Sequence, residues 1–88
     1  MSKVVLTYRL MPDSENFDFD GMEDGIKSRL PPDCQLRDHR IVPIAFGLKS
    51  YEVMIVAEDR EGTTEQIESA LSSVPGIQSV ESVEITLL

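Results

Sequence analysis

The ten residues Leu48-Lys49-Ser50-Tyr51-Glu52-Val53-Met54-Ile55-Val56-Ala57 form the most apolar run of this chain. Successive side chains of a β-strand point to opposite faces of a sheet, so every second residue shares a face. One face of this run would carry Tyr51, Val53, Ile55 and Ala57, and the other Met54 and Val56. A strand with apolar residues on both faces is typical of the interior of a sheet. We therefore expect residues 48–57 to form a central strand.

The residues before this strand predict a hairpin. Residues 34–42 resemble a solvated strand, because their middle consists of Arg37, Asp38, His39 and Arg40. Pro43-Ile44-Ala45-Phe46-Gly47 connects them to the apolar strand. Two strands joined by a short connector that contains glycine indicate an antiparallel hairpin.

The residues after the central strand predict a turn, a helix and a last strand. Glu58-Asp59-Arg60-Glu61-Gly62 forms the turn, Thr63 or Thr64 caps the helix, and Pro75-Gly76 ends it. The apolar face of this helix follows the i, i+3, i+4, i+7 spacing with Ile67, Ala70, Leu71 and Val74. In the last strand Val83, Ile85 and Leu87 alternate with Glu84 and Thr86. Val80 is out of phase with that set, so we expect a bulge or a strand start near Glu81-Ser82.

The N-terminal third predicts one more strand and one more helix. The strand alternates with Val4, Leu6, Tyr8 and Leu10 on one face, and Met11-Pro12-Asp13-Ser14 stops it. The helix face consists of Phe19, Met22, Ile26 and Leu30 at spacings of three and four residues. Asp20 and Glu23 fit a capping pair at its start, and Pro31-Pro32 end it.

The element order is therefore strand, helix, strand, strand, helix, strand. Both helices can cover one face of a four-stranded antiparallel sheet, which is the α+β, ferredoxin-like split βαβ arrangement (βαββαβ). Eighty-eight residues support one modest core, so we expect a single domain over residues 1–88.

Charge and composition exclude several classes of function. Sixteen acidic and eight basic residues give a net charge of −8, which repels phosphate backbones and anionic lipid. We therefore expect no direct nucleic-acid or membrane binding, although an anionic domain can dock on a basic patch of a partner. The N-terminus alternates where a signal peptide would have an apolar run, and no stretch reaches membrane-spanning length. These observations predict a cytoplasmic protein.

A search for reactive groups predicts no catalytic, cofactor or metal site. His39 lies among charged residues, and we interpret it as a surface strand residue. Cys34 is the one cysteine, and we interpret it as a small apolar filler because no defined basic cluster lowers its pKa. No glycine-rich phosphate loop and no calcium-loop pattern is present in the sequence.

The connector contains the most unusual combination of residues, with a large aromatic side chain between small residues. Phe46 can fold back into the core, as apolar side chains usually do. It can equally project outward as an aromatic anchor for a pocket on a partner. The residues alone leave these two alternatives open.

At this connector the chain resembles the exchange domain of the elongation factor 1-beta family. The resemblance rests on Pro43-Ile44-Ala45-Phe46-Gly47-Leu48-Lys49, on the strand Val53 to Ala57 that closes in Glu58-Asp59, and on Ile77-Gln78-Ser79. The length and layout are similar to those of the stand-alone archaeal members. The resemblance extends over essentially the whole chain, and only the central stretch is specific.

The resemblance implies a ferredoxin-like domain that promotes exchange of GDP for GTP on elongation factor 1-alpha, without catalytic chemistry of its own. Family members bind two domains of that GTPase and release GDP by disturbing its magnesium and phosphate site. The implied partner-binding residues are Ala45, Phe46, Gly47, Lys49, Leu87 and Leu88, with Phe46 as the wedge. No cofactor is implied, and a monomer is expected when the protein is free.

One departure concerns the last strand. Eukaryotic members have a penultimate lysine that reaches the magnesium site, whereas this chain has Leu87 there, and Ser50 replaces a second lysine. Either the Phe46 wedge acts alone, or another cation, such as Lys3, Arg9 or Lys49, takes the role of that lysine.

The segment from Ile67 to Val83 also looks like ACT modules and heavy-metal carriers, which have the same fold. A carrier needs a Cys-x-x-Cys pair in the first loop, and this chain has Pro12-Asp13-Ser14-Glu15-Asn16 there. An enzyme of the acylphosphatase type would need an arginine and an asparagine placed to bind phosphate, and the sequence shows no such pair. A small-molecule-binding ACT-like regulatory module therefore remains the alternative function.

Overall fold

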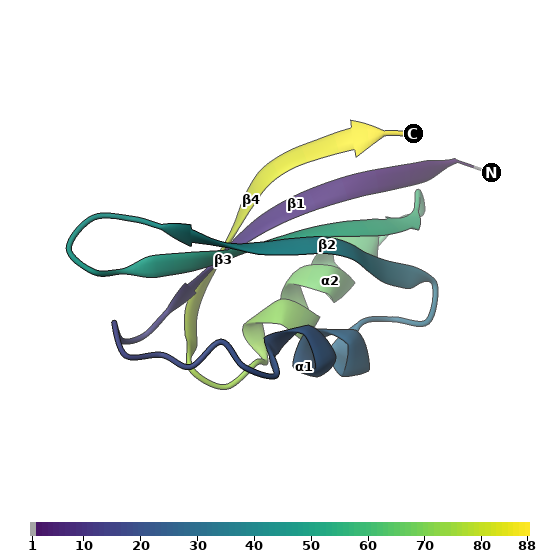
Figure 1. Ribbon diagram of the computed structural model, residues 1–88. Coiled ribbons are helices and arrows are strands. Elements are labelled where there is room, and N and C mark those ends of the chain that lie inside the picture. Colours follow the sequence, from purple (N-terminus) through teal and green to yellow (C-terminus); the bar gives the residue numbers. More distant parts are fainter. Residues whose placement is uncertain (1) are drawn as a thin grey trace.

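The apolar stretch that the sequence places inside the sheet does form an interior strand. The computed structural model describes residues 2–88, and its elements follow the predicted order. They are β1 (Lys3–Pro12), α1 (Met22–Arg29), β2 (Cys34–Pro43), β3 (Lys49–Glu58), α2 (Thr63–Ser72) and β4 (Ile77–Leu87). The strands form one antiparallel sheet in the order β2-β3-β1-β4, and both helices lie on the same side of it (Figure 1). The ferredoxin-like prediction is confirmed.

The core lies between the helices and the inner face of the two central strands. The predicted inner faces of β1 and β3 are buried throughout, and the two helices contribute four buried residues to the core. The buried apolar side chains are Val4, Leu6, Tyr8, Leu10, Met22, Ile26, Cys34, Tyr51, Val53, Ile55, Ala57, Ile67, Leu71 and Val74. The hydroxyl of Tyr8 donates a hydrogen bond to Glu68 Oε2 at 3.3 Å, which ties β1 to α2. Burial, and secondarily the charge of Glu68, raises the pKa of Tyr8.

Both helices begin differently from the prediction. Gly21 and Gly62 are the N-caps, with φ of 81° and 85°, and neither helix has a side-chain capping bond. Asp20 therefore caps nothing, and Thr63 lies inside α2, where its hydroxyl donates to the Glu58 carbonyl at 3.2 Å. The chain enters each helix through a left-handed residue, a conformation that glycine adopts without steric cost. The capping predictions for Asp20 and for Thr63 or Thr64 were wrong for this reason.

Only two of the four residues that were predicted to form the apolar face of the first helix lie within that helix. Met22 and Ile26 are buried on α1, while Phe19 precedes the helix and Leu30 is its C-cap. Phe19 still packs against the core, and its ring stacks on Tyr51 with centroids 5.8 Å apart.

A bulge interrupts β4 close to the predicted position. Thr7 pairs with Glu84 and Tyr8 pairs with Ser82, so Val83 is the extra residue. The bulge brings Val80 opposite Leu10 and Ile85 opposite Leu6, which explains why Val80 is out of phase in the sequence.

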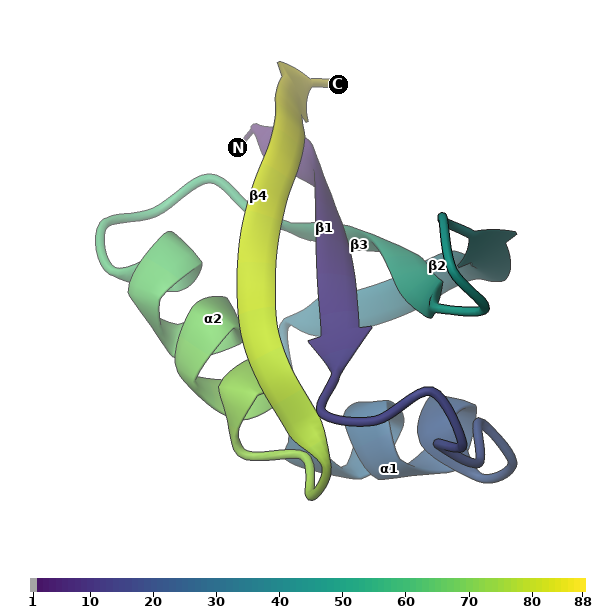
Figure 2. The same cartoon turned by 90° about the vertical axis from the view of Figure 1, so that its left-hand side faces the viewer.

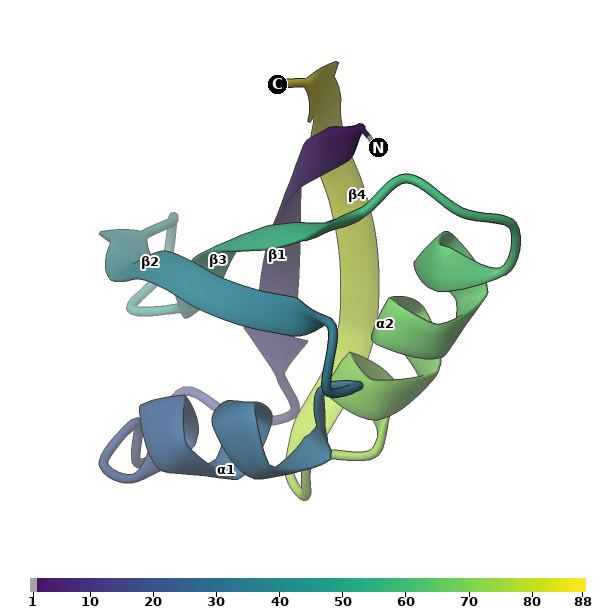
Figure 3. The ribbon, with the colours of Figure 1, turned by 90° about the vertical axis from the view of Figure 1, so that its right-hand side faces the viewer.

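The strands are strongly twisted, and the molecule is elongated. Figures 2 and 3 show β2 crossing the direction of β1 and β4, and the two helices inclined to each other, with α1 at the bottom and α2 rising beside the sheet. The principal extents are 43 × 22 × 18 Å. The β2–β3 hairpin projects at one end, and both termini lie at the other (Figure 1). No helix of residues 2–88 is both long and apolar enough to cross a membrane.

An ion pair joins the two turns nearest the termini. Arg60 Nε donates to Asp33 Oδ2 at 2.6 Å, and the same guanidinium donates to Gln66 Oε1 at 2.8 Å. The hydrogen bond from Arg60 lowers the pKa of Asp33. This pair connects the segment before β2 to the segment before α2.

Candidate functional site at the β2–β3 hairpin

The hairpin that carries the unusual connector ends in a tight turn. The Ile44 amide donates to the Leu48 carbonyl at 2.7 Å, and the Leu48 amide donates to the Ala45 carbonyl at 3.2 Å. Between these bonds Phe46 has φ of 60° and Gly47 has φ of 78°. Two successive positive φ angles are the signature of a type I′ turn, whose twist matches that of the flanking strands.

This turn places Phe46 in solvent. Its side chain is 93% exposed, which excludes the core alternative that the sequence left open. A left-handed conformation costs a residue with a Cβ about 1–2 kcal/mol, a cost that glycine avoids and asparagine reduces. Among residues 2–88, Phe46 is the one non-glycine residue with positive φ. The hairpin thus holds a large apolar ring outward in a conformation that is unfavourable for its type.

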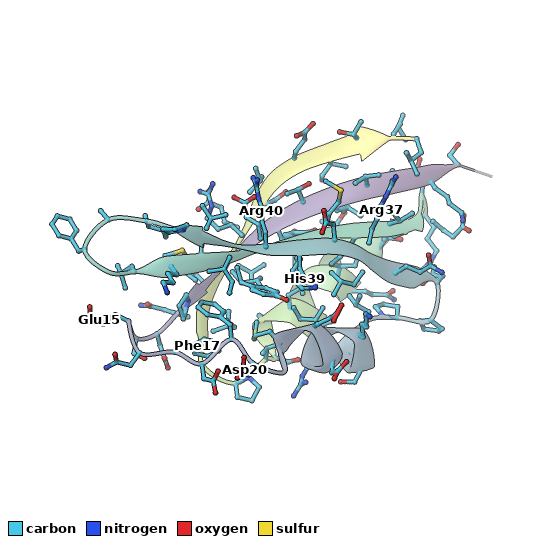
Figure 4. All side chains as sticks on the ribbon, in the orientation of Figure 1. Glu15, Phe17, Asp20, Arg37, His39 and Arg40 are labelled. Carbon is cyan, nitrogen blue, oxygen red and sulfur yellow. The ribbon has the colours of Figure 1, made fainter. Side chains whose placement is uncertain are left out.

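The residues around the turn come from two separate segments. Ile44 is 44% exposed beside the turn, and Lys49 is exposed at the start of β3. The loop between β1 and α1 supplies Glu15, and a Cβ at Gly47 would lie 3.2 Å from Glu15 Oε2. Figure 4 shows Glu15 on this loop beneath the hairpin. The exposed end of the hairpin therefore combines apolar side chains with one cation and one nearby carboxylate.

The predicted partner-binding residues separate into two groups. Ala45, Phe46, Gly47 and Lys49 lie together at the hairpin, whereas Leu87 and Leu88 lie at the opposite end of the sheet. Leu87 pairs with Val4, and Val4 pairs with Ala57 near the far end of β3. At about 3.3 Å per residue, the length of β3 separates the two groups by roughly 30 Å.

The C-terminal group is part of an exposed apolar edge. Ile85 is 53% exposed, Leu87 66% and Leu88 68%, and the bulged Val83 is also exposed. Because β4 is an edge strand, its outer backbone groups have no neighbouring strand in this structure. This edge is apolar, although Glu81 and Glu84 interrupt it along the chain.

The three alternative cations lie at different places. Lys3 lies beside the C-terminus, because the Leu88 amide donates to the Lys3 carbonyl at 2.9 Å. Arg9 lies nearer the hairpin and forms ion pairs with Glu52 at 3.5 Å and Glu81 at 3.7 Å. Lys49 belongs to the hairpin itself. Of these three residues, Lys3 is the one placed to act together with the Leu87 end.

The reactive side chains occupy structural positions. His39 points towards the helices, whereas Arg40 points away from them (Figure 4). The His39 ring stacks on Tyr51 and its Nε2 lies 3.2 Å from Glu23 Oε1. Burial raises the pKa of Cys34 to about 11, so its thiol stays protonated at neutral pH. Residues 2–88 contain no group of three or more potential metal ligands.

Three residues at the hairpin end and the C-terminal end of the sheet were not identified from the sequence, namely Ile44, Glu15 and Ile85. Ile44 belongs to the same connector as Phe46, and its position two residues from this large aromatic could have indicated it. No sequence pattern predicts Glu15, because its approach to Gly47 depends on how two loops distant in the chain pack. The exposure of Ile85 follows from the bulge and from the limited reach of the helices.

This chain is similar to known proteins over nearly its whole length. The family model described as the EF-1 guanine nucleotide exchange domain matches residues 5–88. A protein named elongation factor 1-beta from Methanocella arvoryzae is 41% identical over 86 residues, covering 98% of this chain and 96% of the relative. The elongation factor 1-beta of Methanothermobacter thermautotrophicus is 36% identical over 88 residues, covering 100% of this chain and 99% of the relative.

The fold and the matched family model make this chain a guanine nucleotide exchange domain of the translation elongation machinery. It belongs to the elongation factor 1-beta family, with archaeal relatives that match nearly its whole length.

Proposed function

We propose that this protein promotes the exchange of GDP for GTP on elongation factor 1-alpha, and that Phe46 is its principal anchor on that GTPase. The observation that carries the proposal is the Phe46 side chain, which is 93% exposed and held at positive φ in a member of an exchange-factor family. Large aromatic side chains that enter a pocket of the partner dominate the free energy of many interfaces.

The mechanism requires binding energy rather than a reactive group. An exchange factor must bind the nucleotide-free or distorted GTPase more tightly than the GDP-bound form, because only such a difference shifts the equilibrium. A ring inserted into the nucleotide-binding domain can supply that difference by displacing elements around the magnesium and phosphate site. Ala45 and Gly47 flank the ring with little bulk, which allows close approach of the partner.

The second contact lies at the other end of the sheet. Leu87 and Leu88, with the neighbouring Lys3, form an exposed end roughly 30 Å from Phe46, as the length of β3 implies. Two contacts this far apart match a partner composed of more than one domain. We further propose that the protein binds as a monomer, acts in the cytoplasm and makes no direct contact with nucleic acid.

The proposal is tested by following release of a fluorescent GDP analogue from elongation factor 1-alpha. Substoichiometric amounts of this protein should accelerate release, since the factor is recycled after each exchange. The protein alone should hydrolyse no nucleotide. An unchanged release rate at saturating concentration, with both proteins folded, would remove the proposal.

A further inference from the structure

A groove lies on the sheet beside the exposed hairpin, on the side away from the helices. Its volume is about 410 Å³, and its apolar lining consists of Met11, Val42, Pro43 and Ile44. We call it the hairpin groove. Ile44 belongs both to this lining and to the turn that displays Phe46, because its amide donates to the Leu48 carbonyl. Any partner that surrounds Phe46 therefore lies next to this groove.

The charged residues of the groove neutralise each other. Its remaining charged residues are Arg9 and Glu81, whose Nη1 and Oε1 atoms are 3.7 Å apart. Arg9 also lies 3.5 Å from Glu52, so its guanidinium is held between two carboxylates. A charged ligand group would gain little from such a compensated pair and would lose its hydration on entering the groove. An uncharged, apolar occupant loses nothing of this kind and gains from leaving water.

We infer that the hairpin groove receives an apolar side chain of the same GTPase that takes Phe46. The inference rests on the proposed function and adds a reciprocal contact to it: this protein inserts a ring into the partner, and the partner inserts an apolar side chain here. Such paired insertion fixes the orientation of the hairpin on the partner as well as its affinity.

Two isoleucines allow a matched experiment in one sample. Ile44 and Ile41 are 44% and 47% exposed, yet they lie on opposite sides of the hairpin. Ile41 pairs with Tyr51 and faces the helices, where it lines a hollow with Phe19 and His39. Methyl-labelled protein is titrated with elongation factor 1-alpha, and a soluble paramagnetic probe reports how accessible each methyl group is to solvent. We expect the Ile44 methyl to become protected and the Ile41 methyl to remain accessible.

Substitutions test the same contact by affinity. Ile44→Asp should weaken binding roughly tenfold or more, because a buried apolar contact becomes a desolvated charge, while Ile41→Asp should change it less than about twofold. Glu81→Gln removes one of the two carboxylate partners of Arg9, and we expect it to leave the affinity for the GTPase unchanged or lower. Thermal melts establish that each variant is folded. The methyl experiment uses the wild-type sequence, so it does not depend on the folding of the variants.

The outcomes separate the inference from the proposed function. If Phe46→Asn weakens binding while the Ile44 methyl stays accessible, the groove is empty in the complex and only the inference fails. Protection of Ile41 in place of Ile44 would likewise overturn it, and tighter binding by Glu81→Gln would show an acidic occupant instead. If the protein neither binds the GTPase nor accelerates GDP release, the proposed function and the inference fail together.

Discussion

Replacing Phe46 by asparagine should separate the contribution of this side chain to folding from its contribution to function. In the structure the Phe46 ring is 93% exposed, so its removal takes almost nothing from the core. Its φ of 60° is unfavourable for phenylalanine, and asparagine enters this region more readily. Phe46→Asn should therefore leave the free energy of unfolding unchanged or raise it by up to about 1 kcal/mol. For a domain of this size that corresponds to a rise in Tm of at most roughly 4–8 °C.

The same substitution should strongly weaken docking. A phenylalanine side chain buries about 150 Å² or more when it enters a pocket, and at about 25 cal/mol per Å² this contributes roughly 4 kcal/mol. Imperfect burial and loss of side-chain freedom reduce that value, so we expect a loss of about 2–4 kcal/mol, or roughly 30- to 800-fold in Kd. The rate of GDP release at a fixed low concentration of the factor should fall in parallel.

Calorimetric melts and fluorescent GDP release are measured on the same preparations, with Ile41→Asn as the control. Ile41 is 47% exposed and lies on the other side of the hairpin, so its variant should retain wild-type exchange. The reasoning is refuted if Phe46→Asn loses more than about 3 kcal/mol of folding stability, which is the range of a core aromatic. It is equally refuted if the folded variant exchanges GDP at the wild-type rate.

Four further predictions concern charge and ionisation. Leu87→Lys should accelerate GDP release by up to roughly thirtyfold, because a unit positive charge about 4 Å from the divalent magnesium ion changes its binding by about 2 kcal/mol even in water. Ile85→Lys is the matched control, and equal effects of both variants would show a nonspecific charge effect. Because of the net charge of −8, the association rate with the GTPase should fall roughly tenfold when salt is raised from about 50 to about 500 mM, whereas the dissociation rate should change less. An association rate that does not depend on salt would contradict electrostatic steering. Asp33 has a lowered pKa in the folded state, so its ion pair stabilises the fold at pH values above the ordinary aspartate range, and this stabilisation is lost as pH falls through the folded pKa. The decrease in Tm that Asp33→Asn causes at pH 7 should therefore vanish in acid. A decrease that persists in acid would exclude the ion pair as its cause. Burial raises the pKa of both tyrosines, Tyr8 and Tyr51, so the fold loses stability as pH rises past the ordinary tyrosine range. The absorbance of tyrosinate should therefore appear together with alkaline unfolding. Tyrosine ionisation near pH 10 in a protein that remains folded would count against this prediction.

The sequence predicted the elements and their buried faces well, because both depend on short-range periodicity. The alternation in residues 48–57 and the spacing from Ile67 to Val74 each identify a face that the structure buries, except that Ala70 is only half-buried. The out-of-phase Val80 also predicted the bulge that the structure has at Val83. In each case one segment of the chain contains the whole pattern.

The helix starts show where local reasoning fails. Asp20 and Thr63 are good capping residues by type, but the caps are Gly21 and Gly62. The direction in which the chain leaves the preceding loop decides the φ required at each cap, and that direction depends on where the helix packs under the sheet. A positive φ then favours glycine over any residue that has a Cβ.

In the candidate site, local sequence was enough to identify a large aromatic between small residues in the β2–β3 connector and to place the chain with exchange factors. The three-dimensional structure was needed to show that Phe46 points into solvent, that Glu15 approaches the turn, and that Leu87 lies at the opposite end of the sheet. The physical reason is that a side chain's identity is local, whereas its exposure and its neighbours depend on strand register and turn conformation, which bring together segments far apart in the chain.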